Sequence, residues 1–463
     1  MTKYRSDLYF ILHAILGVIA GYSAGIILYG ALFVFVVGIW YCAKSKQDNP
    51  KAYLFSAYLV GMELIIRMSG VSIPHEFIKY AVVVLLGLEL VLHGKSMPLV
   101  VVLYVLLLIP SALLTNAQTA ELTRQYLSAN LSGHLCLIVS FFYFYNRHLT
   151  VEQLRKTFLS ILYPLAGILG FLFIRTPDLS KIDFGYVSNF ETSIYGPNQV
   201  SAILGLGILL IGVSFFVKIR LFTQITTLVF FGALAFRGLL TFSRGGMVSA
   251  VVTLALVFLF LTWKTAFQGT FFLRMVRVVL LISILAVTVF NYTNELTGNT
   301  LYERYSGRSA TQNESLEKYT SGRSLIIYID WQIFRDHLFL GVGPGMAYFY
   351  RDEYGYPFEV SAHNEFTRLL AEHGLFGVAV LLVLIALPAK RFFDRSLSTF
   401  EKALMIACIG FCFTFMFHSA TRIAAPSFLY GLAFSRIFLP IRRRKKDTNV
   451  QPVEQVSSGM VPG

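Results

Sequence analysis

The chain has 463 residues, of which 56% are hydrophobic and 14% are charged. Soluble domains carry about 25% charged residues, so this composition excludes a water-soluble enzyme or binding module. The net charge of +14 does not indicate nucleic-acid binding, because the cytoplasmic loops of membrane proteins also accumulate lysine and arginine. We therefore predict an all-α polytopic membrane protein.

Apolar runs recur along nearly the whole chain, and each has about the 20 residues needed to cross the hydrocarbon core of a bilayer. We expect about 14 transmembrane helices. They fall near residues 8–22, 25–42, 52–69, 76–93, 97–115, 131–146, 157–174, 199–217, 222–241, 246–263, 275–291, 375–389, 403–420 and 425–441. The region 8–42 could also be divided differently.

Positive charge sets the orientation. If the N-terminus lies inside, the cytoplasmic side receives most of the lysines and arginines of the short loops, including Lys95, Arg147 and the basic run 442–446. Short cytoplasmic loops carry an excess of these residues. We therefore predict that both termini are cytoplasmic.

This topology divides the chain into four segments. We expect an N-terminal transmembrane bundle over residues 1–291, one large outer loop over 292–374, C-terminal transmembrane helices over 375–441, and a basic, disordered cytoplasmic tail over 442–463. Loops longer than about 15 residues are usually functional or disordered, which makes the segment 292–374 the candidate catalytic region.

The outer loop carries local structure signals. Apolar residues recur with helical spacing from Ser324 to Leu340, which predicts an amphipathic helix on the membrane surface, with Ser321 or a neighbour as its N-cap. The glycine-rich stretch Gly341–Gly345 follows. It lacks the Lys-Ser/Thr ending of a phosphate loop, so we predict a tight turn there.

Several motifs in and near this loop resemble the signature of the O-antigen ligase and Wzy-type polymerase superfamily. They are Ser321-Gly322-Arg323, Trp331, Asp336-His337, the Gly341–Gly345 turn, His363-Asn364 and Glu372–Gly377, together with Ser243–Gly246 and Tyr195–Asn198. The resemblance implies a GT-C-like glycosyltransferase of the bacterial inner membrane, with a periplasmic active site and amphipathic helices in its periplasmic loop.

In this superfamily, a glycan is moved from an undecaprenyl pyrophosphate donor to an acceptor hydroxyl. The resemblance leaves two activities open: a polymerase that joins repeats of O-antigen, capsule or exopolysaccharide, and an O-antigen ligase that transfers the glycan to lipid A core in lipopolysaccharide biosynthesis. The number of expected spans favours the polymerase, because ligases of the superfamily tend to have fewer. The expected partners are the donor, a glycan or lipid A core acceptor, membrane lipids and a chain-length regulator, without cofactor or nucleic acid.

A third hypothesis belongs to another class of protein, a flippase or transporter of lipid-linked glycans. Such proteins commonly contain paired internal repeats. We find no repeat, and the polar residues concentrate in the loop instead.

The donor's pyrophosphate needs cations, and arginines bind phosphate oxygens bidentately. The candidates are Arg244 and Arg323, and also Arg237, since a charge inside a span faces the bundle interior or a watery cavity. Arg237 and Arg244 would share a face if one helix continues over both. The plainer alternatives are a solvated loop charge for Arg323 and an interfacial, snorkelling role for Arg244.

His363 is the candidate general base, because an imidazole accepts a proton near neutral pH. A merely structural histidine is the alternative. Asn364 would orient His363 or cap the following helix, and Ser321 and Glu372 are candidate supporting residues. The loop has no Asp-x-Asp motif and no hard-cation spacing of its acids, so we predict a metal-independent, inverting transfer.

Two other charged sites lie inside predicted spans. Glu63 and Arg67 are four residues apart, and we interpret them as a structural ion pair rather than a substrate path. Glu89 has no obvious partner in the sequence.

Overall fold

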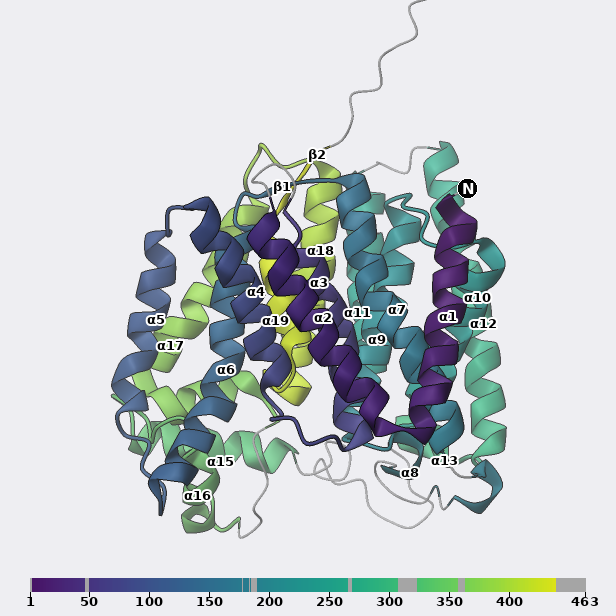
Figure 1. The fold of residues 1–463 in the computed structure, drawn as a ribbon. Coiled ribbons are helices and arrows are strands. Elements are labelled where there is room, and N and C mark those ends of the chain that lie inside the picture. The colour runs from purple at the N-terminus through teal and green to yellow at the C-terminus, as the bar shows by residue number, and fades with distance from the viewer. Residues whose placement is uncertain are drawn as a thin grey trace, which may run out of the picture.

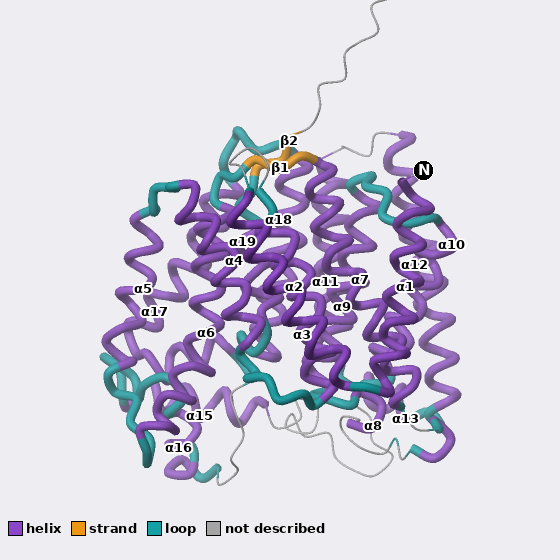
Figure 2. Tube along the Cα trace, viewed as in Figure 1, coloured by secondary structure: helices purple, strands orange, loops and turns teal. Residues whose placement is uncertain are grey.

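The computed structural model describes residues 2–45, 50–176, 178–182, 184, 190–264, 269–306, 323–356 and 363–438. Ser321 and the predicted tail 442–463 lie outside the described residues. Helices dominate the described part of the chain, and its one sheet pairs two short strands in parallel, β1 (His148–Thr150) with β2 (Arg436–Phe438). Figure 2 shows this distribution of helices, strands and loops.

The helices follow one another along the chain. In chain order they are α1 (Thr2–Tyr22), α2 (Ala24–Lys44), α3 (Ala52–Ser69), α4 (Phe77–His93), α5 (Leu99–Ala112), α6 (Ala120–Phe144), α7 (Val151–Arg175), α8 (Phe190–Ser193), α9 (Pro197–Phe216), α10 (Gln224–Leu239), α11 (Arg244–Lys264), α12 (Gly269–Leu296), α13 (Thr300–Ser306), α15 (Arg323–Asp336), α16 (Ala347–Tyr350), α17 (Glu365–Phe392), α18 (Thr399–Ser419) and α19 (Ala424–Leu432). Short 3-10 turns cover Leu179–Lys181 and Asp352–Tyr354.

The long helices run roughly side by side, and the bundle has two distinct ends (Figure 1). The start of α1 lies at the same end as β1 and β2, which we call the strand end. The short helices α8, α13, α15 and α16 lie at the opposite end, which we call the loop end. The predicted topology would make the strand end cytoplasmic.

Nine helices in the described part of the chain are long and apolar enough to cross a bilayer: α2, α3, α6, α7, α9, α11, α12, α17 and α18. The helices α5 and α10 are apolar but shorter. The prediction of a polytopic all-α membrane protein is therefore confirmed, whereas the count of 14 spans is not.

The helices differ in how deeply they are buried in the bundle. In α9, 94% of the most apolar window is buried, whereas only 6% of the window in α12 is, so α9 is central and α12 faces outward. Close packing at the centre depends on small residues: a Cβ added at Gly205 of α9 would lie 2.4 Å from the carbonyl oxygen of Gly246 in α11. Such small-residue contacts let membrane helices approach closely.

The predicted amphipathic helix is present as α15, and it is shorter than the stretch 324–340 expected from the sequence. Its buried positions Ile326, Ile329 and Ile333 follow helical spacing and face α17. With Val342, Met346, Ala347 and Ala371, Ile329 and Ile333 form a small hydrophobic core separate from the main one. This core anchors the loop end to the bundle.

The glycine-rich turn after α15 docks onto a kink in α17. Gly341, Gly343 and Gly345 all have positive φ, and the amides of Val342 and Gly343 donate to the carbonyls of Ala371 and Glu372 at 3.0 and 2.9 Å. The kink is at Gly374, with φ 58° and ψ −135°. The predicted tight turn is therefore observed, and its role is to fix the first two turns of α17.

The predicted span 425–441 is not a full helix. Its helix, α19, has nine residues, about 14 Å at 1.5 Å per residue, and the chain then enters β2. The amide of Ala424 at its start donates to Glu63 Oε2 at 2.7 Å. Residues Thr421 and Ile423 before it are buried, so the connection between α18 and α19 lies inside the protein.

Candidate active site

Three motif segments that are distant in the sequence meet at Asn198, the second residue of α9. Its Oδ1 accepts a hydrogen bond from Arg323 Nη2 at 3.0 Å and another from Ser243 Oγ at 2.7 Å. Arg323 is the first residue of α15, and Ser243 immediately precedes α11. Asn198 therefore fixes the position of Arg323 against the central helix of the bundle.

Two further arginines lie beside Arg323. Arg244, the first residue of α11, donates from Nη1 to the carbonyl of Arg304 in α13 at 3.1 Å. Burial lowers the pKa of Arg323, and the charge of Arg244 lowers it further. Burial, Arg244 and Arg323 together lower the pKa of Arg304 to about 10. The three guanidinium groups, which we call the arginine cluster, therefore repel one another and favour an anion between them.

Several cationic side chains influence the pKa of His363. Its Nδ1 is buried and has no hydrogen-bond partner among the residues that the structure describes. Burial, followed by the charges of Arg422, Arg323, Arg351 and His418, lowers the pKa of His363 to about 3. The imidazole is therefore neutral at pH 7, and an anion bound nearby would raise its pKa again.

The structure brings together most of the predicted site residues. Arg244 and Arg323 belong to the arginine cluster, and the charge of Arg323 lowers the pKa of His363. Asn364 caps α17, since its Oδ1 accepts from the amide of Phe366 at 2.9 Å. Glu372 is buried, and its Oε2 lies 3.7 Å from Arg368 Nη1. Ser321 falls outside the described residues.

Arg237 is held elsewhere. Its Nη2 donates to the carbonyl of Leu172 at 2.9 Å and to the hydroxyl of Thr176, both at the end of α7. The helix α10 ends at Leu239 and α11 starts at Arg244, so Arg237 and Arg244 do not share a face of one helix as anticipated. A role of Arg237 in donor binding stays a prediction.

A cavity of about 410 Å³ opens between the membrane helices and the loop end. Four arginines line it: Arg67 of α3, Arg351 after α16, Arg368 of α17 and Arg422 between α18 and α19. Glu76 and Glu372 supply carboxylates, and Tyr126, Tyr195 and Tyr348 supply aromatic surface. The charges of Arg351 and Arg422, which line this cavity, and of Arg323, which belongs to the arginine cluster, all lower the pKa of His363.

The expected ion pair of Glu63 and Arg67 is present, with Arg67 Nη2 2.7 Å from Glu63 Oε1. The same Nη2 donates to the carbonyl of Arg422 at 2.9 Å. Because Glu63 also binds the first amide of α19, the pair fixes the α18–α19 connection and places Arg67 in the wall of the cavity. Its structural role is therefore observed, at the border of the site.

Sequence reasoning missed several buried partners. Arg351 pairs with Asp330, and Glu365 pairs with both Arg368 and His134. Asp330 interrupts the apolar stripe of α15 between Ile329 and Ile333, which was a usable signal. Glu89 was assigned no partner, and this was wrong: it accepts hydrogen bonds from the amides of Lys51 and Ala52, at 2.9 and 3.3 Å, at the start of α3.

Within the described residues, no group of three or more His, Cys, Asp or Glu side chains could hold a metal ion. The metal independence of the reaction stays a prediction.

Comparison with known families adds one decisive match: residues 228–382 match the family model described as O-antigen ligase. Over this stretch the chain is similar to the O-antigen ligase family. The matched stretch runs from α10 into α17 and includes Arg244, Arg323, His363 and Glu372. No curated protein gives a significant match to the chain. The resemblance predicted from the motifs is therefore confirmed, whereas Asn198 and Arg422 lie outside the matched stretch.

Proposed function

We propose that this protein is a glycosyltransferase that moves a glycan from undecaprenyl pyrophosphate to an acceptor hydroxyl at the periplasmic face of the bacterial inner membrane. The observation that carries the proposal is the position of His363, whose buried Nδ1 has no partner among the described residues while cations of three separate segments act on its ring. A neutral base beside an anion site suits this reaction.

In the proposed reaction, His363 takes the proton of the acceptor hydroxyl as the oxygen attacks the anomeric carbon of the donor sugar. The bond from that carbon to the pyrophosphate oxygen breaks, and polyprenyl pyrophosphate leaves. Arg244, Arg304 and Arg323 stabilise the negative charge that grows on the leaving group, because guanidinium groups hold phosphate oxygens in a fixed fork. Attack opposite the leaving group inverts the anomeric configuration.

The low pKa of His363 suits an ordered reaction. Without an anion, burial and the surrounding cations together hold the pKa of His363 at about 3, and the imidazole is a weak base. A bound pyrophosphate would offset the charges of Arg323 and Arg422, and it would thereby raise the pKa and the proton affinity of His363. The base is then strongest when the donor is in place.

The cavity suits the acceptor sugar. Its lining residues Arg351 and Arg422 carry charges that lower the pKa of His363, and its wall combines tyrosine rings with charged side chains. Aromatic rings offer apolar faces and polar edges, which matches the two kinds of surface on a sugar ring. Within this activity, the acceptor of a polymerase is itself a lipid-linked glycan, and the acceptor of a ligase is lipid A core; the experiment below distinguishes the two.

The test uses cells that lack this gene, complemented with wild type, His363→Ala or Arg323→Ala at equal protein level. Arg335→Ala is the matched control, because Arg335 has an exposed side chain at the end of α15, away from the cluster contacts. We expect His363→Ala and Arg323→Ala to abolish the mature surface glycan and the control to retain it.

The material that accumulates distinguishes the candidate activities. Single repeats on the lipid carrier indicate a polymerase, and full-length chains on the carrier indicate a ligase. Lipid-linked repeats trapped on the cytoplasmic leaflet would indicate a flippase and refute the transferase. Normal surface glycan from His363→Ala would refute the assignment of the base.

A further inference from the structure

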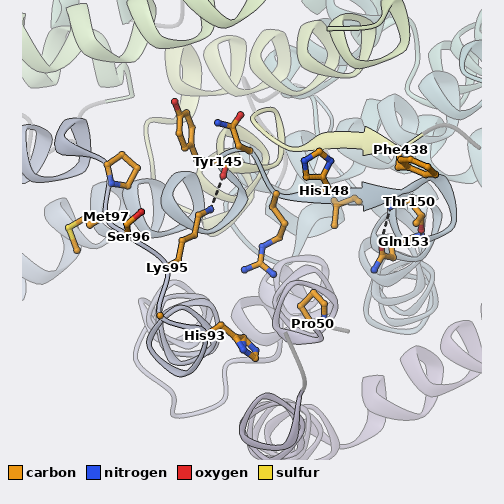
Figure 3. Close-up of a pocket in the computed structure, with 15 residues that line it drawn as sticks. Pro50, His93, Lys95, Ser96, Met97, Tyr145, His148, Thr150, Gln153 and Phe438 are labelled. Carbon is orange, nitrogen blue, oxygen red and sulfur yellow. Dashed lines mark hydrogen bonds between the residues drawn. The ribbon is translucent and has the colours of Figure 1, made fainter. Parts of the chain in front are cut away.

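A second large pocket is lined by residues of β1 and β2. These strands lie at the strand end, opposite α15 and α16 (Figure 1). The volume of the pocket is about 920 Å³, and it lies between the α4–α5 connection, the α6–α7 connection and Phe438 of β2. Figure 3 shows His93, Lys95 and His148 among the side chains around it. The superfamily match ends before β2 and begins after α7, so this pocket is outside the matched stretch.

The lining of the pocket is basic. Lys95, Arg147, His93 and His148 line it, and none of its described lining residues is Asp or Glu. Among the described ion pairs, one carboxylate contacts a lining residue: Glu89 Oε1 lies 4.0 Å from His93 Nε2. That carboxylate already accepts hydrogen bonds from the hydroxyl of Ser45 and from the amides of Lys51 and Ala52 at the start of α3. It is therefore occupied by these donors.

Arg147 is held in place by two contacts. Its Nε donates to the carbonyl of Tyr143 at 3.1 Å, and its guanidinium lies 3.8 Å from the centre of the Tyr143 ring. No hydrogen bond to its two terminal nitrogens occurs among the described residues. The group is thus fixed in orientation and keeps donors for a ligand, which is the arrangement that binds phosphate oxygens bidentately.

Lys95 contributes charge rather than free donors. Its Nζ donates to the carbonyls of Phe142, Tyr143 and Tyr145 at 2.8, 3.1 and 2.7 Å, at the end of α6. Burial, with the charge of Arg147 second, lowers the pKa of Lys95 to about 8. The two cations therefore lie close together, and an anion between them would relieve their repulsion.

The surroundings indicate what carries the anion. The pocket lies at the ends of α4 and α6 and at the start of α5, the level at which lipid headgroups meet the ends of membrane helices. Val91, Met97 and Leu99 next to it are 80%, 57% and 81% exposed. A ligand with a charged head and apolar chains would contact both the basic pocket and the exposed apolar side chains, whereas a free phosphate would contact only the basic pocket.

We propose that this pocket binds the phosphate group of an anionic membrane lipid, with Arg147 as its main ligand, Lys95 as a supporting charge and His148 as a supporting hydrogen-bond donor. Basic pockets at the cytoplasmic ends of membrane helices are suited to such headgroups. The inference does not depend on the transferase activity, because none of its residues belongs to the arginine cluster or the cavity beside His363.

The test measures binding to the full-length protein in detergent by native mass spectrometry and by the thermal unfolding midpoint. The added ligands are phosphatidylglycerol, phosphatidylcholine and inorganic phosphate. We expect phosphatidylglycerol to raise the midpoint and to bind about tenfold more weakly to Arg147→Gln, with a smaller loss for His148→Gln. The control Arg395→Gln, an exposed arginine at the strand end, should bind as wild type does.

Two outcomes would overturn the proposal. Equal binding of phosphatidylglycerol by wild type, Arg147→Gln and His148→Gln would show that the pocket does not bind the lipid. A response to inorganic phosphate without a response to phosphatidylglycerol would show that the site takes a free anion. Midpoints measured without added lipid identify a variant that has lost its fold, and His148→Gln, which changes an exposed side chain, then carries the comparison.

Discussion

Arg351 and Asp330 form a buried ion pair, with Arg351 Nη2 2.7 Å from Asp330 Oδ1. Both side chains are 0–1% exposed. The other oxygen of Asp330 accepts from Thr367 Oγ1 at 2.9 Å, so one carboxylate joins α15, the segment after α16 and α17. This pair holds the loop end in the position that places Arg323 and His363 near each other.

Removal of one partner should therefore be costly. Arg351→Leu leaves the Asp330 carboxylate buried without its cation, and we expect a loss of about 3–5 kcal/mol in the free energy of unfolding. The double variant Arg351→Leu/Asp330→Leu should recover much of that loss. Chemical unfolding in detergent measures the double-mutant cycle, and additive losses would show that the pair is not coupled.

Gly374 should not tolerate a side chain. Its φ of 58° with ψ of −135° is a conformation that other residues avoid, and an added Cβ would lie 2.5 Å from the carbonyl oxygen of Leu338. We expect Gly374→Ala to cost about 3 kcal/mol or more. Gly355 is the control, since it also has positive φ and no atom within 4 Å of an added Cβ, so Gly355→Ala should cost only about 1 kcal/mol. The unfolding midpoints of the two variants measure these losses of stability. Equal losses for Gly374→Ala and Gly355→Ala would contradict the predicted steric clash.

The fork of Arg323 should matter as well as its charge. Arg323→Lys keeps a cation but cannot bond Asn198 and a phosphate in the same fixed geometry. We expect transfer from a lipid pyrophosphate donor to fall by about 10- to 100-fold, with a wild-type rate for the exposed control Arg335→Lys. Full activity of Arg323→Lys would reduce its role to that of a point charge.

The depressed pKa of His363 predicts a pH effect on stability. The unfolded histidine has a pKa near 6.5, and the folded one titrates at about 3, so between these values the unfolded chain binds the extra proton. Stability from this group is fully present above about pH 6.5 and falls as the pH is lowered toward 3. His363→Gln should lose less stability than wild type between pH 6.5 and pH 4. Parallel curves of unfolding midpoint against pH would contradict the buried, neutral imidazole.

Local signals in the sequence predicted several parts of the site. The helical spacing of Ile326, Ile329 and Ile333 identified α15, because a helix on a core must bury one face. The glycine-rich stretch identified the turn, because positive φ is accessible to glycine. The motif residues Arg323, His363 and Asn364 were indicated by the resemblance to the superfamily signature, and the family match covers all three.

The sequence by itself determined the class of protein, because a chain with long apolar runs and few charges has no alternative to membrane helices. It did not determine where the last span breaks, since hydropathy does not record that Glu63 caps α19 from α3. Nor did it place Arg422, Asn198 or the pair of Arg351 with Asp330, 21 residues apart in the chain. Those contacts join segments that only packing brings together, and a partner's distance in space is not encoded in local composition or periodicity.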